Sequence, residues 1–451
     1  MDKVLALLAQ LENAQLVGNG AGNELVYRFK HALTQEAAYQ SLLVKKRREI
    51  HLHVAQAYEQ QYVGNLDEYA GLLVEHYAMA QDDDRLASYA LKAGHAAMRV
   101  NAYAEARSYY TRALEALSRL PETDDNRRLY VDALTKLVSA SFASDSPERN
   151  FQRMSQAESL ALQLTAAPDP PRADRLRLVR IHFWMGDARY FRNRLPEALG
   201  YYRQTIKEAR LLADTSREVI ASSAMARVLT VQGHFDQGGE MSASVAEPFE
   251  RVANWPEWVW AVAFRGQALA QMGEYVEGTA TVQRALARAL ATHNLLGVAA
   301  YYLSLVIIYM LGRDLAHARG VNQAAQAAVA SGDLVMAYST NGFQSWIESR
   351  LGLHEAAAES MRQALTIQDK LGGQLLFEDW FAAIRGELAL NAGRVDEAVE
   401  LSKQAASLAQ LAGGIFAEGM ARQVWGRAAH AVRSVLLGTG RRTVGREHAP
   451  V

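Results

Sequence analysis

The chain has 451 residues, and its 48 Lys and Arg nearly balance its 49 Asp and Glu, so that it has a net charge of −1 and no long-range attraction for nucleic acid or an anionic membrane. It has no cysteine, which excludes disulfides, thiolate metal ligands and a cysteine nucleophile and is typical of a protein of the reducing cytoplasm. Half of its residues are hydrophobic and only 9 are proline, a composition that favours long helices.

The N-terminal segment, residues 1–58, follows an order of elements that the rest of the chain does not repeat. Residues 7–17, LLAQLENAQLV, predict a helix, and residues 18–23, GNGAGN, predict a turn. Residues 25–30, LVYRFK, alternate like a strand, and residues 31–59 have the apolar period of one or two amphipathic helices. The first residues mix acidic with apolar side chains and do not predict a signal peptide.

This N-terminal segment resembles the end of the winged helix that follows the ATPase module in bacterial STAND proteins, the signal-transducing ATPases with numerous domains, which include cyclase-linked and MalT-like members. The residues that carry the resemblance are Tyr27, Phe29, His31, Ala32, Leu33, Glu36, Tyr39, Leu42, Leu43, Arg47, Arg48 and His51. In that family a histidine at the strand-to-helix corner senses the phosphate of bound ADP, so the resemblance implies a nucleotide-sensing role for His31. The alternative is that His31 only caps or packs at this corner.

A basic run, residues 45–48, lies within the same segment. A winged helix could use such a run to contact nucleic acid, but these charges precede Ile50, Leu52 and Val54, as on a helix with one solvated and one packed face. Four basic residues form a weak patch in a neutral chain. We therefore do not expect a nucleic-acid partner.

A turn signal that recurs with a period of about 40 residues, as in helical repeat arrays, organises the rest of the chain. Gly or Asn is followed about five positions later by Ala or Gly, and this pair recurs at Asn101, Asn193, Gly233, Gly273, Gly312, Gly352 and Gly393. The steps from Asn193 onward are almost equal, and the interval between Asn101 and Asn193 provides room for two longer steps. A stretch with helical apolar period flanks each signal on both sides, which predicts two antiparallel helices joined by a tight turn in each repeat. The Gly or Asn supplies the left-handed backbone that ends the first helix.

Small residues recur at matching positions of the two helices. Gly94, Gly186, Gly266 and Gly386 lie twelve positions before Ala106, Ala198, Gly278 and Ala398, and Tyr110 and Tyr202 follow four positions after the first two of these partners. This pattern resembles the tetratricopeptide repeat, although the period is longer than the ~34 residues usual in that family. The resemblance implies an all-α fold, a right-handed α–α superhelix of helix-turn-helix repeats over residues 59–435. Residues 436–451 are short, basic and expected to be disordered.

The most apolar stretch, Leu295–Leu311, has no charged residue. It is shorter than the ~20 residues that a membrane span needs, and it lies in register with the repeats. We therefore predict a buried solenoid helix there, and no membrane partner.

No sequence motif for catalysis or for cofactor binding is present. The chain has no GxxxxGK[ST], HExxH or GxSxG, and no GxGxxG with a following acidic residue. His51 and His53 point about 200° apart on a helix and cannot share a metal ion. We predict that the chain is not an enzyme and has no cofactor and no metal site.

The first helices of such repeats line the concave side of a solenoid, where ligands bind. Counting from the small-residue positions predicts a binding groove lined by Arg180, Phe183, Asp187, Tyr190, Phe191, Arg227, Trp260, Gln267, Gln271, Trp346, Arg350, Trp380 and Glu387. Trp, Tyr and Arg often anchor interfaces because they bury a large area and keep a polar group. The alternative is that these aromatic side chains fill the spaces between adjacent repeats.

The sequence thus favours an interaction solenoid, a sensor that binds a protein, peptide or effector and regulates an ATPase signalling module in the same or another chain. One alternative is that the chain is the C-terminal part of an ATPase or nucleotide cyclase and shares that activity. Another is that it belongs to a MalT-like transcriptional regulator, although no helix-turn-helix domain follows the repeats.

Overall fold

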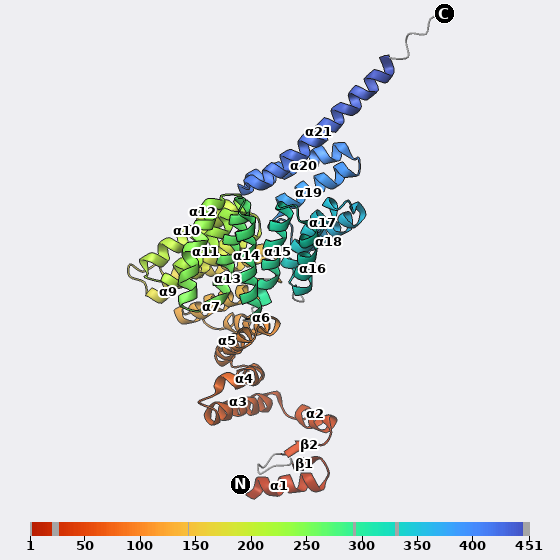
Figure 1. The fold of residues 1–451 in the computed structure, drawn as a ribbon. Coiled ribbons are helices and arrows are strands. Elements are labelled where there is room, and N and C mark those ends of the chain that lie inside the picture. The colour runs from red at the N-terminus through yellow and green to blue at the C-terminus, as the bar shows by residue number, and fades with distance from the viewer. Residues whose placement is uncertain (1, 20–26, 143, 292–294, 330–332, 445–451) are drawn as a thin grey trace, which may run out of the picture. The chain divides into compact units, whose positions relative to one another are not determined.

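The computed structural model describes residues 2–19, 27–142, 144–291, 295–329 and 333–444, whose helices and strands are shown in Figure 1. The chain divides into two compact units, Met1–Asn126 and Arg127–Val451. Nearly all described elements are helices, arranged as successive antiparallel pairs. The prediction of an all-α array of helix pairs is therefore confirmed.

The first unit begins with a helix and a small sheet and continues as paired helices. Its elements are α1 (Asp2–Asn13), β1 (Val17–Asn19), β2 (Tyr27–Phe29), α2 (Ala32–Gln40), α3 (Val44–Gln61), α4 (Leu66–Ala80), α5 (Asp83–Arg99) and α6 (Tyr103–Leu117). The two strands are antiparallel, with Val17 opposite Phe29. Of the strand predicted for residues 25–30, the central residues Tyr27–Phe29 form β2. The helix predicted to reach Val17 was wrong at its end, because Val17 pairs in the sheet.

The second unit contains the remaining repeats. Its helices are α7 (Asp124–Ser141), which begins at the boundary, α8 (Pro147–Leu164), α9 (Arg172–Phe191), α10 (Leu195–Leu211), α11 (Thr215–Gln232), α12 (Phe235–Arg251), α13 (Trp255–Gln271), α14 (Tyr275–Ala291), α15 (Leu295–Leu311), α16 (Leu315–Ala328), α17 (Leu334–Arg350), α18 (His354–Lys370), α19 (Glu378–Asn391), α20 (Val395–Ala412) and α21 (Ile415–Val444). Odd-numbered helices are the first helices of the repeats, and α7 with α8 occupies the long interval before Asn193.

Left-handed backbone follows the first helix of each repeat at nearly every predicted residue. The predicted residues with positive φ are Asn101, Asn193, Gly233, Gly273, Gly352 and Gly393. Gly312 was predicted wrongly, since the left-handed residue there is Arg313, with φ of 59°. Arg313 lies five positions before the fully buried Ala318. The distance to the small residue of the second helix therefore decides where the chain turns, even where this places a non-glycine residue in a disfavoured conformation.

The small residues allow the two helices of a repeat to approach closely, as predicted. A Cβ atom at Gly186 would lie 2.6 Å from Cε1 of Tyr202, and one at Gly266 would lie 2.7 Å from the carbonyl oxygen of Gly278. The first repeat of this type, in the first unit, has the corresponding contact between Gly94 and Tyr110. The predicted pairing of a small residue with its partner is confirmed at these positions.

The first helices of the second unit form its inner layer, because each from α9 to α19 contacts the next first helix as well as its own partner. Ion pairs from Asp132 connect α7 with α9 in the same layer. This unit also closes on itself. The backbone N–H of Leu376, in the loop before α19, donates to the carbonyl oxygen of Phe191 at 2.8 Å. The Gln232 side chain donates to the carbonyl oxygen of Ala412, also at 2.8 Å. Segments that are far apart in the chain are thus hydrogen-bonded.

The apolar stretch forms helix α15, with Val306 and Ile308 at its buried side. The described part of the chain contains no helix with both the length and the hydropathy for crossing a bilayer. The predicted buried helix is therefore confirmed.

The proposed segment boundary near residue 58 falls inside α3. The compact units divide at residue 126 instead, so the proposed boundary rests on the family resemblance alone and stays a prediction. Of the tail predicted as disordered, residues 436–444 belong to α21, and residues 445–451 lie outside the described part.

Candidate functional site

A pair of oppositely charged side chains lies on the inner layer, between α9 and α11. Asp187 is 5% exposed and accepts hydrogen bonds from Arg227 Nη2 at 2.9 Å and from Tyr202 Oη at 2.6 Å. Burial raises the pKa of Asp187, and the charge of Arg227 opposes this shift. Asp187 and Arg227 are one repeat period apart, so they occupy the same position in successive repeats.

Aromatic rings surround this charged pair. The Arg227 guanidinium carbon is 5.1 Å from the ring centre of Tyr190 and 5.5 Å from that of Trp260. Trp260, which is only partly buried, also contacts Tyr301 on α15, with ring centres 5.5 Å apart. The structure therefore brings Asp187, Tyr190, Arg227 and Trp260 together from three repeats, in an arrangement suited to cation–π contacts.

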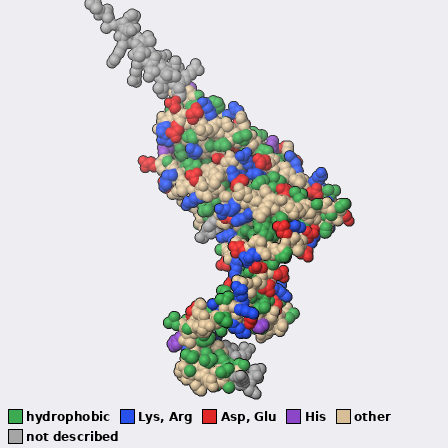
Figure 2. All heavy atoms as spheres, turned by 180° about the vertical axis from the view of Figure 1, so that it is seen from behind, with side chains coloured by type: hydrophobic (Ala, Val, Ile, Leu, Met, Phe, Trp, Pro, Cys, Tyr) green, Lys and Arg blue, Asp and Glu red, His purple; other side chains and the backbone are tan. Residues whose placement is uncertain are grey.

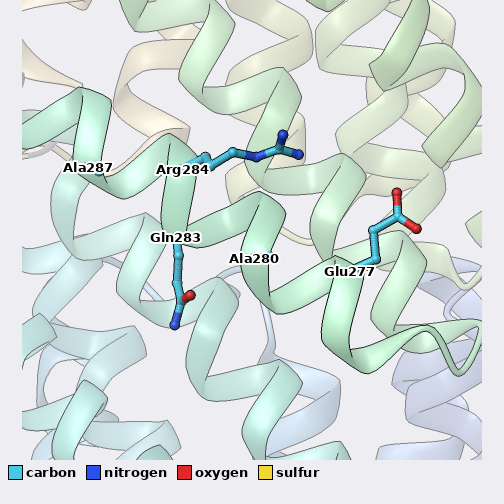
Figure 3. Close-up of a pocket in the computed structure, with 5 residues that line it drawn as sticks. All are labelled: Glu277, Ala280, Gln283, Arg284 and Ala287. Atoms are coloured by element: carbon cyan, nitrogen blue, oxygen red, sulfur yellow. The ribbon is translucent and has the colours of Figure 1, made fainter.

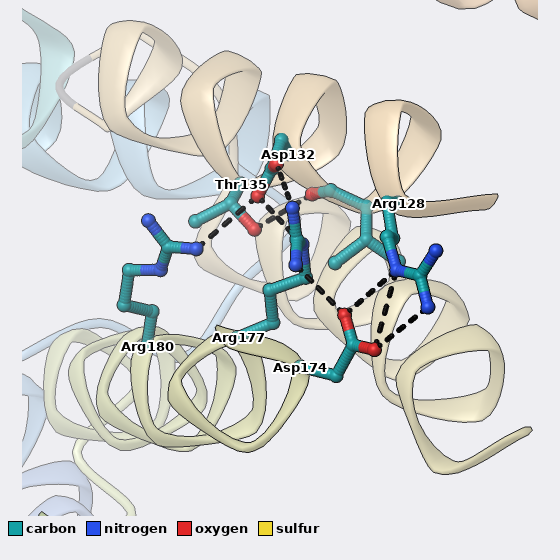
Figure 4. Close-up of polar contacts among 7 residues, drawn as sticks. Arg128, Asp132, Thr135, Asp174, Arg177 and Arg180 are labelled. Carbon is teal, nitrogen blue, oxygen red and sulfur yellow. Dashed lines mark hydrogen bonds and ion pairs between the residues drawn. The ribbon is translucent and has the colours of Figure 1, made fainter. Parts of the chain in front are cut away.

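A second network, shown in Figure 4, connects α7 with α9. Asp174 is 1% exposed and accepts from Arg128 at 3.0 Å and from Arg177 at 2.8 Å. Asp132 on α7 accepts from Arg177 at 2.7 Å and from Arg180 at 3.2 Å. Arg180 reaches across to α7 and keeps 32% of its side chain exposed. The predicted residue Arg180 is thus on the inner layer and accessible.

Two further polar groups on the inner layer, the half-buried Glu257 and the buried Tyr301, have incomplete pairing. Burial raises the pKa of Glu257 on α13, with the Arg227 charge opposing the shift. The Tyr301 hydroxyl is buried without a hydrogen-bond partner among the described residues, and burial raises its pKa as well. These groups lie near Arg227 and extend the polar part of the inner layer toward α15.

Trp346 and Trp380 were predicted to line the same groove, and the structure places both in a packed core. They are 4% and 2% exposed, with ring centres 6.1 Å apart. Phe416 lies 4.7 Å from Trp380, and Phe377 lies 5.7 Å from it. This core includes the loop that closes the second unit, so little of either tryptophan side chain is available to a ligand. The role of Trp346 and Trp380 in binding therefore stays a prediction.

Two further predicted groove residues, Glu387 and Arg350, form a separate ion-paired group. Glu387 is 4% exposed and pairs with Arg350 at 3.3 Å and with Arg427 at 3.5 Å. Gln267 on α13 is 3% exposed. The predicted set therefore divides into a polar region around Arg227, an aromatic core around Trp380 and this ion-paired group.

Lys136, Arg217, Glu257 and Tyr301 lie on the inner layer and were not among the residues predicted from the sequence. A signal for two of them was available, because Arg177, Arg217 and Glu257 are spaced by one repeat period, like Asp187 and Arg227. Charged residues at the same position of successive repeats predict contacts between the first helices of neighbouring repeats. No comparable spacing pointed to Lys136.

His31 is at the N-cap position of α2, with extended backbone. Its side chain makes no capping hydrogen bond, and the residue is exposed. His51, which was considered with His53 as a metal pair, instead lies with Nδ1 2.9 Å from Nδ1 of His76 and Nε2 3.0 Å from the Tyr39 hydroxyl. In the described part of the chain, no three His, Cys, Asp or Glu side chains are grouped so as to hold a metal ion.

Figure 3 shows a hollow on the outer surface, whose lining residues all belong to α14. This hollow is not an enclosed site. Glu277, Gln283 and Arg284 are exposed there, and no second element forms an opposite wall. Figure 2 shows acidic and basic side chains interspersed over the visible surface, without a large patch of one sign. The inner layer is therefore the better candidate for a binding surface.

Comparison with known proteins identifies the fold. No protein-family model matches the chain, and no curated protein sequence matches it. Among solved structures, a Rap protein complexed with the competence and sporulation factor is similar, with a TM-score of 0.52 at 11% identity over 77% of this chain and 99% of that one. NprR in complex with its cognate peptide NprX has a TM-score of 0.55 at 9% identity, over 81% and 98%.

The Rap conjugation gene regulator of plasmid pLS20, solved with the Phr* peptide, has a TM-score of 0.53 at 14% identity, over 74% of this chain and 93% of that one. Identities this low show the fold alone. Together with the helix pairs described above, these similarities define the chain as a tetratricopeptide-like helical solenoid.

Proposed function

We propose that the inner layer of the second unit binds a peptide, or a protein segment, in the cytoplasm and acts as a sensor. The observation that carries this proposal is the Asp187–Arg227 pair between the rings of Tyr190 and Trp260. The guanidinium between aromatic rings, together with the accessible Arg180 two turns before Asp187 on α9, offers both apolar area and hydrogen bonds to a ligand. A purely structural ion pair would not require a partly exposed tryptophan at its edge.

The similar structures support a peptide as the ligand. The Rap protein, the pLS20 regulator and NprR were each solved with a peptide or factor named in their descriptions. Their shared fold with this chain makes a peptide the first ligand to test. The predicted groove residues Trp346, Arg350, Trp380, Glu387 and Gln267 stay in this proposal as a second region, in which Arg350 is the exposed residue and the other four are buried in the free chain.

We further propose that the sensor regulates a STAND-type ATPase module through residues 1–58, as the end of a winged helix, with residues 59–435 as the solenoid. Support comes from the strand pair followed by α2 and from His31, whose exposed side chain is available to a partner. Leu33 is 84% exposed and Leu43 is 79% exposed. The proposal assigns these two exposed apolar side chains to the contact with the ATPase module.

Selection from a phage-displayed library of random linear peptides tests the binding proposal. We expect peptides that bind the whole chain, with affinity about tenfold weaker for Arg180→Ala or Trp260→Ala, which corresponds to ~1.4 kcal/mol. The control is Arg362→Ala, because Arg362 is on α18 and its side chain is 69% exposed. Equal affinity for all three variants would remove the inner layer from the site.

The ATPase proposal has its own test. The purified chain should hydrolyse no ATP, but should change the hydrolysis rate of a STAND ATPase module encoded in the same genome. Leu33→Asp with Leu43→Asp should abolish this effect while peptide binding persists. Saturable hydrolysis by the chain alone would favour the alternative in which the chain is itself part of an ATPase or cyclase.

A further inference from the structure

Two cationic side chains on the inner layer have no ion-pair partner. Lys136 is on α7 and Arg217 is in the first turn of α11, on either side of Arg180 on α9. Within the described ranges, neither side chain has a hydrogen bond or an ion pair, and Arg217 uses only its backbone N–H, which donates to Asp214. Both residues are half-buried. An unpaired charge in such a position is unfavourable unless something else neutralises it.

The three cations are close enough to affect one another. Burial lowers the pKa of Lys136, and the charges of Arg180 and Arg217 lower it further. Burial and the charge of Arg180 likewise lower the pKa of Arg217. Lys136, Arg180 and Arg217, from three successive first helices, thus place three positive charges in one region of the inner layer.

Nearby carboxylates act against these shifts, Asp132 at Lys136 and Asp214 with Glu257 at Arg217, but the pKa of each cation stays lowered. Asp132 already accepts from Arg177 and Arg180, as Figure 4 shows. Asp214 caps α11 by accepting the backbone N–H of Arg217. Glu257 forms no ion pair among the described residues, and burial raises the pKa of its carboxyl group. Five cations lie in this region, Lys136, Arg128, Arg177, Arg180 and Arg217, and four carboxylates, Asp132, Asp174, Asp214 and Glu257, so positive charge is in excess in the free chain.

We propose that Lys136, Arg180 and Arg217 form an anion site that binds a carboxylate of the peptide ligand. This inference rests on the proposed peptide-binding function and specifies an acidic side chain of the peptide. A guanidinium donates two parallel hydrogen bonds to a carboxylate, and an ammonium adds a point charge beside it. A free oxyanion from solution, such as phosphate, has the same chemistry, and the experiment separates the two sources.

The test uses a double variant that carries both Lys136→Met and Arg217→Met, called the anion-site variant, and a matched control. The control is Lys207→Met with Arg203→Met, which makes the same two changes at exposed positions of α10. Without ligand, the anion-site variant should melt at a higher temperature than the wild type, because it removes unpaired half-buried charges. The control should not. A lower melting temperature would show that the two cations are satisfied structural groups and would overturn the proposal.

Binding is measured with synthetic copies of peptides selected from the library on the wild-type chain. We expect the selected peptides to contain Asp or Glu, and their affinity for the anion-site variant to fall at least tenfold. Replacing the acidic residue by its amide should weaken wild-type binding equally and have no further effect in the variant. Peptides that lack acidic residues, or that bind the variant as tightly as the wild type, would overturn the anion site and leave peptide binding intact.

Inorganic phosphate is tested separately, by its effect on the melting temperature at constant ionic strength. If no peptide is selected but phosphate raises the melting temperature of the wild type and not of the anion-site variant, the site takes a free anion. That result would overturn its assignment to a peptide and the proposed function together. If neither peptide nor phosphate distinguishes the two chains, no anion site exists.

Discussion

Replacing Gly186 with alanine tests how tightly the two helices of the central repeat pack. The added Cβ would lie 2.6, 2.8 and 3.2 Å from three ring atoms of Tyr202, whereas carbon atoms in contact prefer ~3.5–4.0 Å. The ring cannot move freely, because Tyr202 is fully buried and its hydroxyl is bonded to Asp187 at 2.6 Å. Displacing the ring far enough to relieve the overlap would break that bond.

Three effects set the size of the change. Overpacking costs about 1–3 kcal/mol, and a lost hydrogen bond to a charged group costs about 1.5–3 kcal/mol. Alanine recovers about 1 kcal/mol through its higher helix propensity. We therefore expect Gly186→Ala to lower the free energy of unfolding by about 2–4 kcal/mol in urea titrations followed by circular dichroism.

Gly200 provides the matched control. It lies inside α10, is exposed, and has no atom within 4 Å of the position of an added Cβ. Gly200→Ala should therefore stabilise the chain by up to about 1 kcal/mol, through helix propensity alone. If both glycine variants have the same stability, the close contact with Tyr202 does not constrain this repeat, and the reasoning is refuted.

Three other changes test the interior of the second unit. Arg227→Met should cost about 3–5 kcal/mol in urea titrations, because it leaves Asp187 buried without its cation; wild-type stability would contradict this. Burial raises the pKa of Asp379 from 3.8 to about 6, so the folded chain binds a proton that the unfolded chain releases. Its contribution therefore makes stability fall by about 3 kcal/mol as the pH rises from about 4 to about 6. Asp379→Asn should remove this part of the pH dependence, and an unchanged profile would contradict the shift. Leu376→Pro removes the N–H that closes the unit, and should speed amide hydrogen exchange in the α9–α10 turn relative to Leu376→Ala, which keeps it; equal exchange would contradict the closure.

The closure of the second unit changes what its inner layer can offer to a ligand. The loop before α19 packs Leu376 and Phe377 against the aromatic core, at 6% and 9% exposure. Asn193, in the α9–α10 turn, donates to Asp379 at 3.0 Å and extends the same contact. The loop lies against α17 and α19, whereas the region from α7 to α13 keeps Arg180 accessible beside the half-buried Lys136 and Arg217. The first part of the proposed peptide site, around Arg227, and the anion site both lie in that region.

Contacts within a single repeat could be predicted from the sequence, because they depend on residues close together in the chain. The repeat period, the left-handed turn at Gly233 and the approach of Gly186 to its partner helix all follow from local spacing. The turn residue predicted at Gly312 was wrong because the prediction used the residue type, glycine. The spacing to the next small residue selects Arg313.

The sequence by itself thus determined the helix pairs and the face of each first helix, whereas only the tertiary structure decided which of those faces meet. The small rotation from each repeat to the next accumulates along the array, and no local pattern predicts that Leu376 reaches Phe191. For the same reason the burial of Trp380 and the unpaired state of Lys136 became visible only in the folded chain. Residue type identified groups able to bind, and the superhelical geometry decided which of them remain accessible.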